Sequence, residues 1–121
     1  MDKQSRSILV EGLFGAGNLL GKVDWRPFRD GVDISPLYQD PDKGSSAALL
    51  RYQPGASVPK HDHDAAEYIL VLEGSQSDGS REYHAGCMMI SGPGTRHAIT
   101  SENGCIVLAI WGKPVRFVEQ E

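Results

Sequence analysis

The stretch that decides the fold runs from residue 55 to residue 74 and reads GASVPKHDHDAAEYILVLEG. It contains two histidines separated by one residue, His61 and His63, and then Glu67. Successive side chains of a β-strand point to opposite faces, so on a strand the two imidazoles lie on one face about 7 Å apart. On a helix they would diverge. The spacing therefore predicts a strand that aims two imidazoles at a common point.

Glu67 and His97 complete a candidate metal site. Glu67 shares the parity of the two histidines, and residues 64–66 allow a bend that places its carboxylate opposite the imidazoles. His97 follows about thirty residues later, so we expect it on a distant strand that closes the site across a barrel. Burying imidazoles and a carboxylate without a cation is costly. Nitrogen and oxygen ligands without sulfur suit one divalent transition metal per chain: iron(II), zinc, manganese, nickel or copper.

Outward from this stretch, the chain from residue 22 onward predicts an all-β fold. Short apolar or alternating runs are separated by turn residues such as Pro54-Gly55 and Asp78-Gly79, which is typical of a sandwich or barrel. The candidate strands, about eight in all, are residues 22–28, 32–38, 47–53, 67–72, 80–84, 88–91, 97–100 and 105–111. Residues 68–72 are apolar at every position, so we expect that strand to be covered on both faces, at the centre of a double-layered sheet.

The length of 121 residues suits one domain, which we place at residues 22–121, with an N-terminal arm at residues 1–21. The glycines of the arm do not form a dinucleotide-binding loop, because Leu20 stands where the third glycine is required. The apolar run at residues 8–20 is too short to span a membrane, and no signal-peptide cleavage pattern follows it. We therefore expect a soluble, cytoplasmic protein.

Charge and cysteine content argue against several classes of partner. Twelve Lys and Arg against sixteen Asp and Glu give a formal net charge of -4, which repels phosphate backbones and anionic lipid. We expect neither nucleic acid nor a membrane as a partner. The two cysteines, Cys87 and Cys105, form no CxxC pair, which argues against a zinc ribbon and a disulfide scaffold. We expect both thiols to be small core residues in a reducing compartment.

Three other polar residues have simpler predicted roles. His84 lies near the Asp78-Gly79 hairpin and is predicted to be exposed. Asp62 and Asp64 have the opposite parity to the ligands, so we expect them to be solvent-facing charges. A hydrogen bond from one of them to a histidine ligand is the alternative.

The residues around the histidines resemble the first motif of the cupin superfamily. That motif, G-x5-H-x-H-x3-E-x6-G, is matched at every position, by Gly55, His61, His63, Glu67 and Gly74. The resemblance implies a small double-stranded β-helix, or jelly-roll, cupin barrel. It also implies four metal ligands: His61, His63, Glu67 and His97.

The second cupin motif, G-x5-P-x-G-x2-H-x3-N, is matched by Gly86, Gly94 and His97. Gly92 stands at the proline position and Ser101 at the asparagine position.

Residues 22–112 resemble the cupin domain of ChrR-type anti-sigma factors and their single-domain relatives, in the runs DWRPF (24–28), LLRYQPGA (49–56) and VLEG (71–74). ChrR-type regulators bind their sigma factor through a separate N-terminal zinc domain with His and Cys ligands. This chain has no histidine before His61 and no cysteine before Cys87, so we do not expect a sigma factor as its partner. Because cupin barrels commonly pair through a sheet face, the resemblance implies a homodimer.

Two classes of function stay open. Similar single-domain cupins include metal-dependent dioxygenases that cleave diketones or aryl hydroxyketones, which implies an oxidoreductase acting on a small oxygen-chelating substrate. The alternative is a ChrR-like metal-binding sensor or regulatory module without turnover. A small molecule bound by either class of protein would occupy a pocket beside the metal. The candidate pocket residues are those expected on the same strand face as Glu67 or His97, namely Ile69, Val71 and Ile99, and three able to make polar or aromatic contacts, namely Arg51, Tyr52 and Trp111. No general base is assigned.

Overall fold

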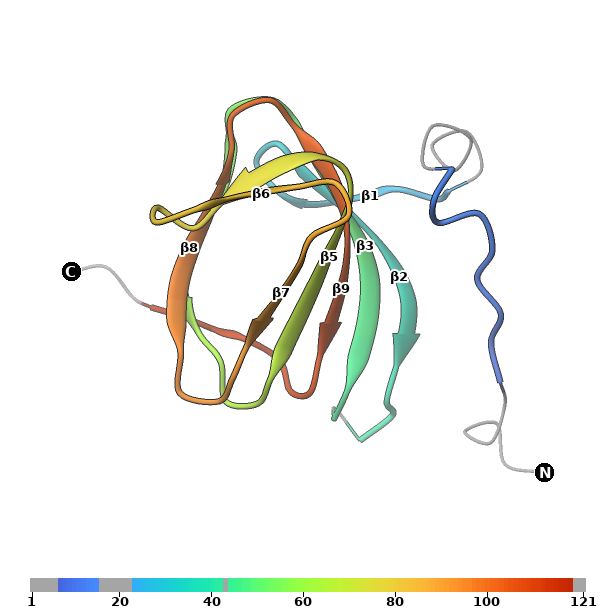
Figure 1. Ribbon diagram of the computed structural model, residues 1–121. Coiled ribbons are helices and arrows are strands. Elements are labelled where there is room, and N and C mark those ends of the chain that lie inside the picture. Colours follow the sequence, from blue (N-terminus) through green and yellow to red (C-terminus); the bar gives the residue numbers. More distant parts are fainter. Residues whose placement is uncertain (1–6, 16–22, 43, 119–121) are drawn as a thin grey trace.

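The computed structural model in Figure 1 describes residues 7–15, 23–42 and 44–118. These residues form ten strands and no helix, which confirms the all-β prediction. The strands are β1 (Arg26–Arg29), β2 (Val32–Gln39), β3 (Ser46–Tyr52), β4 (Ala56–Asp62), β5 (Glu67–Ser77), β6 (Glu82–His84), β7 (Met88–Ser91), β8 (Arg96–Ser101), β9 (Cys105–Trp111) and β10 (Arg116–Phe117).

The strands pair antiparallel in the order β1-β2-β3-β9-β5-β8-β4-β10, and β6 and β7 also pair with β5. The sheet curls into a barrel with two walls, as Figure 1 shows: β2, β3, β9 and β5 form one, and β4 and β8 form the other. Buried apolar side chains from both walls form the core, among them Leu50, Val58, Ile69, Ile99 and Val107.

Strand β5 joins the two walls through a β-bulge. Residues 67–74 pair with β9, and the register shifts between Val71 and Glu73. Beyond the bulge, Ser75, Gln76 and Ser77 pair with β6, and Ser77 also pairs with β8. One extra residue reverses the parity of the strand, so Gln76 faces inward although its number has the opposite parity to Glu67.

Gly74 makes the sharp bend after this bulge. Its φ is +77°, and a Cβ atom at this position would collide with the carbonyl oxygen of Gly104, the residue just before β9. Only glycine meets both conditions without strain. This is the physical requirement behind the second glycine of the histidine motif.

The expectation that residues 68–72 are covered on both faces is wrong. The strand does lie at the centre of the sheet, but Tyr68 on its outer face is 36% exposed, and Leu70 and Leu72 are only half-buried. The barrel interior covers one face alone.

Three other local expectations need correction. Only the histidine spacing predicts β4, without bounds, and nothing predicts β10, because their sequences, ASVPKHD and RF, show no regular apolar alternation. The first candidate strand, 22–28, begins at a residue outside the described ranges, and β1 starts at Arg26. Cys105 is buried as predicted, whereas Cys87 is exposed.

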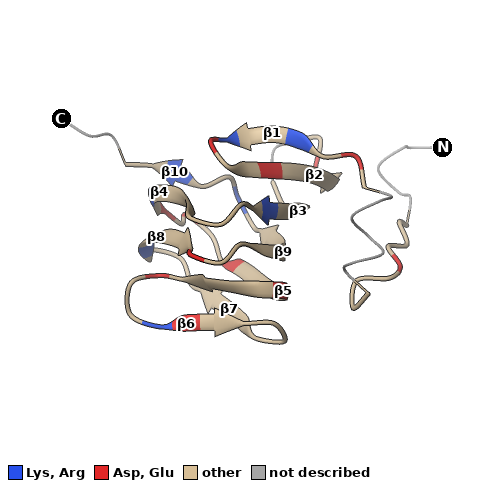
Figure 2. Cartoon of the chain, turned by 90° about the horizontal axis from the view of Figure 1, so that it is seen from above, with Lys and Arg blue, Asp and Glu red and all other residues tan. Residues whose placement is uncertain are grey.

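The predicted arm lies only partly within the described residues, since residues 1–6 and 16–21 fall outside them. Residues 7–15 lie outside the barrel in both views (Figures 1 and 2) and include a turn closed by a hydrogen bond from the Gly15 N–H to the Gly12 carbonyl. Figure 2 also shows basic and acidic residues interleaved over the strands rather than gathered by sign. Among the described residues, no helix has the length and hydropathy that a membrane span requires.

Candidate metal centre

The four predicted ligands lie together at one end of the barrel. His61 on β4 is directly paired with His97 on β8, His63 follows β4, and Glu67 is the first residue of β5. His97 therefore comes from the neighbouring strand of the same wall, not from across the barrel as expected. The three imidazole centroids are 4.5 to 5.0 Å apart.

The donor atoms of these side chains are suited to a single cation. One ligand atom from each of the four residues lies within 4.8 Å of the other three. Two ligands on opposite sides of an ion, each bound at about 2.1 Å, are about 4.2 Å apart. A contraction of up to about 0.6 Å would thus close the set around a metal.

Hydrogen bonding supports the same interpretation. His63 Nε2, Glu67 Oε1 and His97 Nε2 are buried, and none has a hydrogen-bond partner within the described part of the chain. Glu67 Oε1 lies 3.2 Å from His63 Nε2 and 3.3 Å from His97 Nε2. Leaving three polar atoms of this kind unsatisfied in the interior costs several kcal/mol, of order 1–3 for each. A bound divalent cation would satisfy all three.

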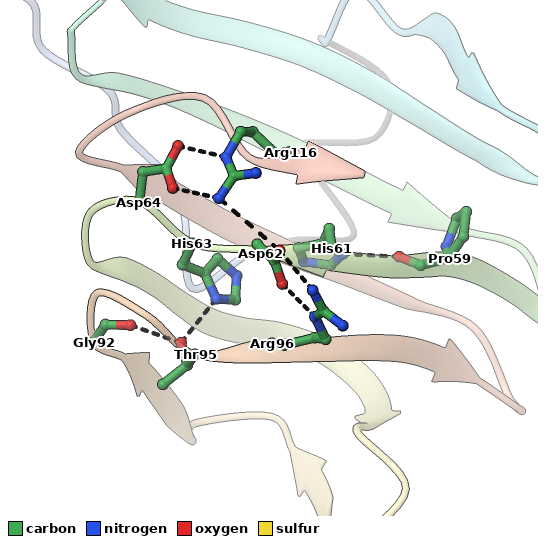
Figure 3. A network of polar contacts seen from close by, with 9 residues as sticks. All are labelled: Pro59, His61, Asp62, His63, Asp64, Gly92, Thr95, Arg96 and Arg116. Atoms are coloured by element: carbon green, nitrogen blue, oxygen red, sulfur yellow. Dashed lines mark hydrogen bonds and ion pairs between the residues drawn. The ribbon is translucent and has the colours of Figure 1, made fainter. Parts of the chain in front are cut away.

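Backbone and hydroxyl groups orient two of the imidazoles, as Figure 3 shows. His61 Nδ1 lies 2.9 Å from the Pro59 carbonyl oxygen, which can only accept, so His61 donates. The Thr95 hydroxyl donates to the Gly92 carbonyl at 2.6 Å and accepts from His63 Nδ1 at 2.9 Å. These contacts assign the protons to Nδ1 and leave each Nε2 lone pair free for a metal. Burial also lowers the pKa of His61, although the Pro59 hydrogen bond opposes it, so this ring is neutral near pH 7.

Trp111 orients the carboxylate. Its indole N–H donates to Glu67 Oε2 at 2.7 Å, which leaves Oε1 directed at the histidines. Burial acts to raise the pKa of the Glu67 carboxyl, but His97, His63 and the Trp111 hydrogen bond together hold it below its ordinary value. The carboxylate is therefore charged at neutral pH and supplies the negative charge that a cation requires.

Thr95, Pro59 and Trp111 were not assigned these roles from the sequence. Nothing in the residue types or spacing distinguishes Thr95 or Pro59, and for Trp111 the sequence predicts only a pocket contact. The loop that carries Thr95 is fastened to His63 by two backbone hydrogen bonds, His63 N–H to the Thr95 carbonyl at 3.0 Å and Gly94 N–H to the His63 carbonyl at 2.8 Å.

Ser101, which stands at the motif's asparagine position, is fully buried and donates from its hydroxyl to the Ser75 carbonyl at 2.6 Å. It thereby joins β8 to the second half of β5.

Two acidic neighbours of the ligands bind arginines instead of histidines. Asp62 accepts from Arg96 at 2.9 Å, and Asp64 accepts from Arg116 at 2.7 and 2.8 Å (Figure 3). Each hydrogen bond holds the pKa of its carboxyl below the ordinary value. These contacts fasten β10 and β8 to β4. His84 is exposed, as predicted, and pairs with Glu82 at 3.0 Å.

A cavity of about 30 Å³ adjoins the ligands inside the barrel. Of the candidate pocket residues, Tyr52, Ile69, Ile99 and Trp111 line it. The sequence did not indicate Gln76 or Phe117 as lining residues, because a bulge reorients the first and the second belongs to the unpredicted strand β10.

Two candidate pocket residues lie elsewhere. Val71 packs in the apolar core. Arg51 alternates with Tyr52 and so faces outward, where it pairs with Asp33 at 2.7 Å and lies over the Trp25 ring. Arg51 therefore does not line this cavity.

The two edge strands meet near the cavity. The guanidinium carbon of Arg29 on β1 lies 3.7 Å from the centre of the Phe117 ring on β10. The Phe117 ring is 5.7 Å from the His61 ring. A cation–π contact between the two edge strands therefore lies beside the candidate metal ligands.

A family model described as the ChrR Cupin-like domain matches residues 19–113. The chain belongs to this family. This ChrR cupin-like chain is 36% identical over 104 residues to the anti-sigma-E factor ChrR of Cereibacter sphaeroides. The match covers 84% of the chain and 47% of that protein, so the chain spans about half the length of this curated relative.

Solved structures show the same cupin fold. ChrR in its complex with SigE from Rhodobacter sphaeroides has a TM-score of 0.68 at 26% identity, covering 90% of this chain and 70% of the other. A putative acetylacetone dioxygenase from Methylibium petroleiphilum PM1 has a TM-score of 0.81 at 18% identity, covering 98% and 85%; at this identity it shows the fold alone. Because the relative ChrR is found with a sigma factor, our expectation that a sigma factor is not a partner loses support.

Proposed function

We propose that this ChrR cupin-like chain binds one divalent transition metal through His61, His63, Glu67 and His97 and takes up a small oxygen-chelating substrate there, with activity of the dioxygenase type. The observation that carries the proposal is the set of three buried ligand atoms, one each from His63, Glu67 and His97, that face one another without hydrogen-bond partners in the described residues. For an enzyme of this type, we propose that the metal is iron(II), manganese or nickel.

The chain's own residues provide the conditions for such chemistry. When bound, the metal would act as a Lewis acid toward a chelating oxygen. The imidazoles of His61 and His63 present oriented lone pairs, and Glu67 contributes one negative charge held by Trp111. Ile69 and Ile99 line the cavity with apolar surface that excludes bulk water. Four protein ligands leave two positions on an octahedral metal but none on a tetrahedral zinc ion.

Metal content and oxygen uptake test the enzyme proposal. Chain loaded with iron(II) should consume oxygen with at least one member of a panel of diketones, thiols and catechols. His61→Ala should lose the uptake, whereas the matched variant His84→Ala should keep it because His84 is exposed and remote from the ligand group. Equal uptake by the chain and by His61→Ala would contradict the proposal.

The second candidate function is a ChrR-like sensor or regulatory module without turnover, and the 36% identity to an anti-sigma factor favours it. In that case we expect zinc in fixed stoichiometry, no oxygen uptake with any compound of the panel, and a sigma factor bound in trans. Titration with a sigma factor of the SigE type, followed by analytical ultracentrifugation, would measure that association. Iron, manganese or nickel in the purified chain together with uptake would contradict this candidate.

A further inference from the structure

The cavity beside the metal ligands contains a buried amide with an unsatisfied oxygen. Gln76 is 2% exposed and lines the cavity. Its Nε2 donates a weak hydrogen bond to Cys105 Sγ at 3.8 Å. Its Oε1 is buried without a hydrogen-bond partner in the described residues. Regular alternation along β5 would place Gln76 on the face opposite to Glu67. The bulge before Gly74 turns its side chain inward instead.

Two titratable groups beside this amide, Tyr52 and Cys105, are neutral. Burial raises the pKa of Tyr52 far above its ordinary value, and the negative charge of Glu67 acts in the same direction, whereas the Gln76 amide opposes both. Burial likewise raises the pKa of the Cys105 thiol. No lysine or arginine lines the cavity among the described residues. The charged side chain that does line the cavity is Glu67, which repels an anion and directs its free oxygen at His63 and His97, so this region suits a neutral partner.

The size of the cavity limits what can reach the amide. About 30 Å³ is room for about two water-sized groups. Leu50, Val58 and Ile99 supply apolar surface around it. A ligand end that fits therefore has about two heavy atoms beyond the part held at the metal, and the atom nearest Gln76 Oε1 must donate a hydrogen bond.

We propose that Gln76 is a specificity-determining residue that selects small ligands bearing, beyond their metal-chelating oxygens, a neutral hydroxyl or amide N–H donor. This inference rests on the proposed function, since it places the chelating end of the ligand at the metal. It narrows the substrate class from any oxygen chelator to short chelators with a donor at the inner end. A simple diketone, which lacks such a donor, would leave the Gln76 oxygen unsatisfied.

Two isosteric probes test the inference. Glycolohydroxamic acid and propionohydroxamic acid share the chelating group and differ by a hydroxyl in place of a methyl. Each would be titrated into the cobalt(II)-loaded chain and followed by the visible absorption of the metal. One neutral hydrogen bond gives a preference of roughly threefold to tenfold for the hydroxyl probe. Gln76→Leu should abolish that preference, and the matched variant Gln53→Leu, at an exposed glutamine, should retain it.

The outcomes separate this inference from the proposed function. If both probes bind the unmodified chain equally, or if Gln76→Leu keeps the preference, the inference is overturned while the metal site stands. If the chain retains no cobalt, or if neither probe changes the spectrum, the proposed function fails and the inference fails with it. The comparison on the unmodified chain needs no variant, so it decides the matter even if Gln76→Leu does not fold.

Discussion

Replacing Trp111 by phenylalanine should weaken metal binding without unfolding the barrel. The indole N–H donates to Glu67 Oε2 at 2.7 Å, and both groups are at least partly buried. Phenylalanine keeps most of the ring that packs against the core but cannot donate. The carboxylate oxygen then loses its partner, and the pKa of Glu67 rises because one of the contacts that lowers it is gone.

The expected size of the effect follows from the kind of hydrogen bond. Loss of a hydrogen bond to a charged group costs about 2 kcal/mol, which corresponds to roughly a 30-fold increase in the metal Kd. Removing a residue that orients a metal ligand typically weakens affinity by about 10- to 100-fold, so the two estimates agree. The assay is competition between the chain and a chromophoric chelator for zinc or cobalt at pH 7.5.

The chain has two tryptophans, and the second provides a control. Trp25 Nε1 is buried without a hydrogen-bond partner in the described residues, and its ring lies against Arg51, away from the ligands. Trp25→Phe should therefore leave the metal Kd unchanged. A Kd of Trp111→Phe equal to that of Trp25→Phe, with both variants folded by circular dichroism, would refute the role given to Trp111.

The remaining predictions concern protons, metal, the bulge and the outer face. Metal affinity should fall as the pH drops below about 6, since imidazole must be neutral to ligate and its ordinary pKa is about 6.5; affinity that stayed flat from pH 8 to about 5 would contradict the histidine ligands. Removing metal that is present at about 100 times its Kd should lower the free energy of unfolding by about 2.7 kcal/mol, and calorimetry that shows no change in Tm with a chelator would argue against a metal held in the folded chain. Gly74→Ala should lower the free energy of unfolding, measured by urea titration, by about 2 kcal/mol or more, because a Cβ there strains the backbone and meets Gly104. Gly79→Ala, with positive φ but open space around it, should lower it by less. Equal losses of stability in the two variants would show that the close approach to Gly104 is unimportant. We also expect the chain to be a homodimer that buries an exposed row of Ile90, Tyr68 and Ile110, which pair directly across β7, β5 and β9. Ile90→Lys should therefore reduce the mass measured by light scattering. A monomeric unmodified chain would contradict this expectation.

The sequence predicted the strand pattern and the ligand candidates because both follow from short-range rules. Alternation on a strand relates His61 to His63 within three residues, and Pro54-Gly55 marks the turn before β4. It predicted less well where a strand is irregular or polar. Strand β4 has no apolar alternation, and the outer face of β5 is apolar yet largely uncovered.

The sequence by itself predicted an all-β chain with a histidine and glutamate group, since those features depend on residue type and local spacing, and the motif that they form carries the resemblance to cupins. Tertiary structure alone decided that His97 lies beside His61, that Trp111 and Thr95 orient the ligands, and that Gln76 faces the cavity. These contacts join residues far apart along the chain or depend on a bulge of one residue. Side-chain direction beyond such a bulge is set by the pairing register of neighbouring strands, and register is a property of the folded sheet.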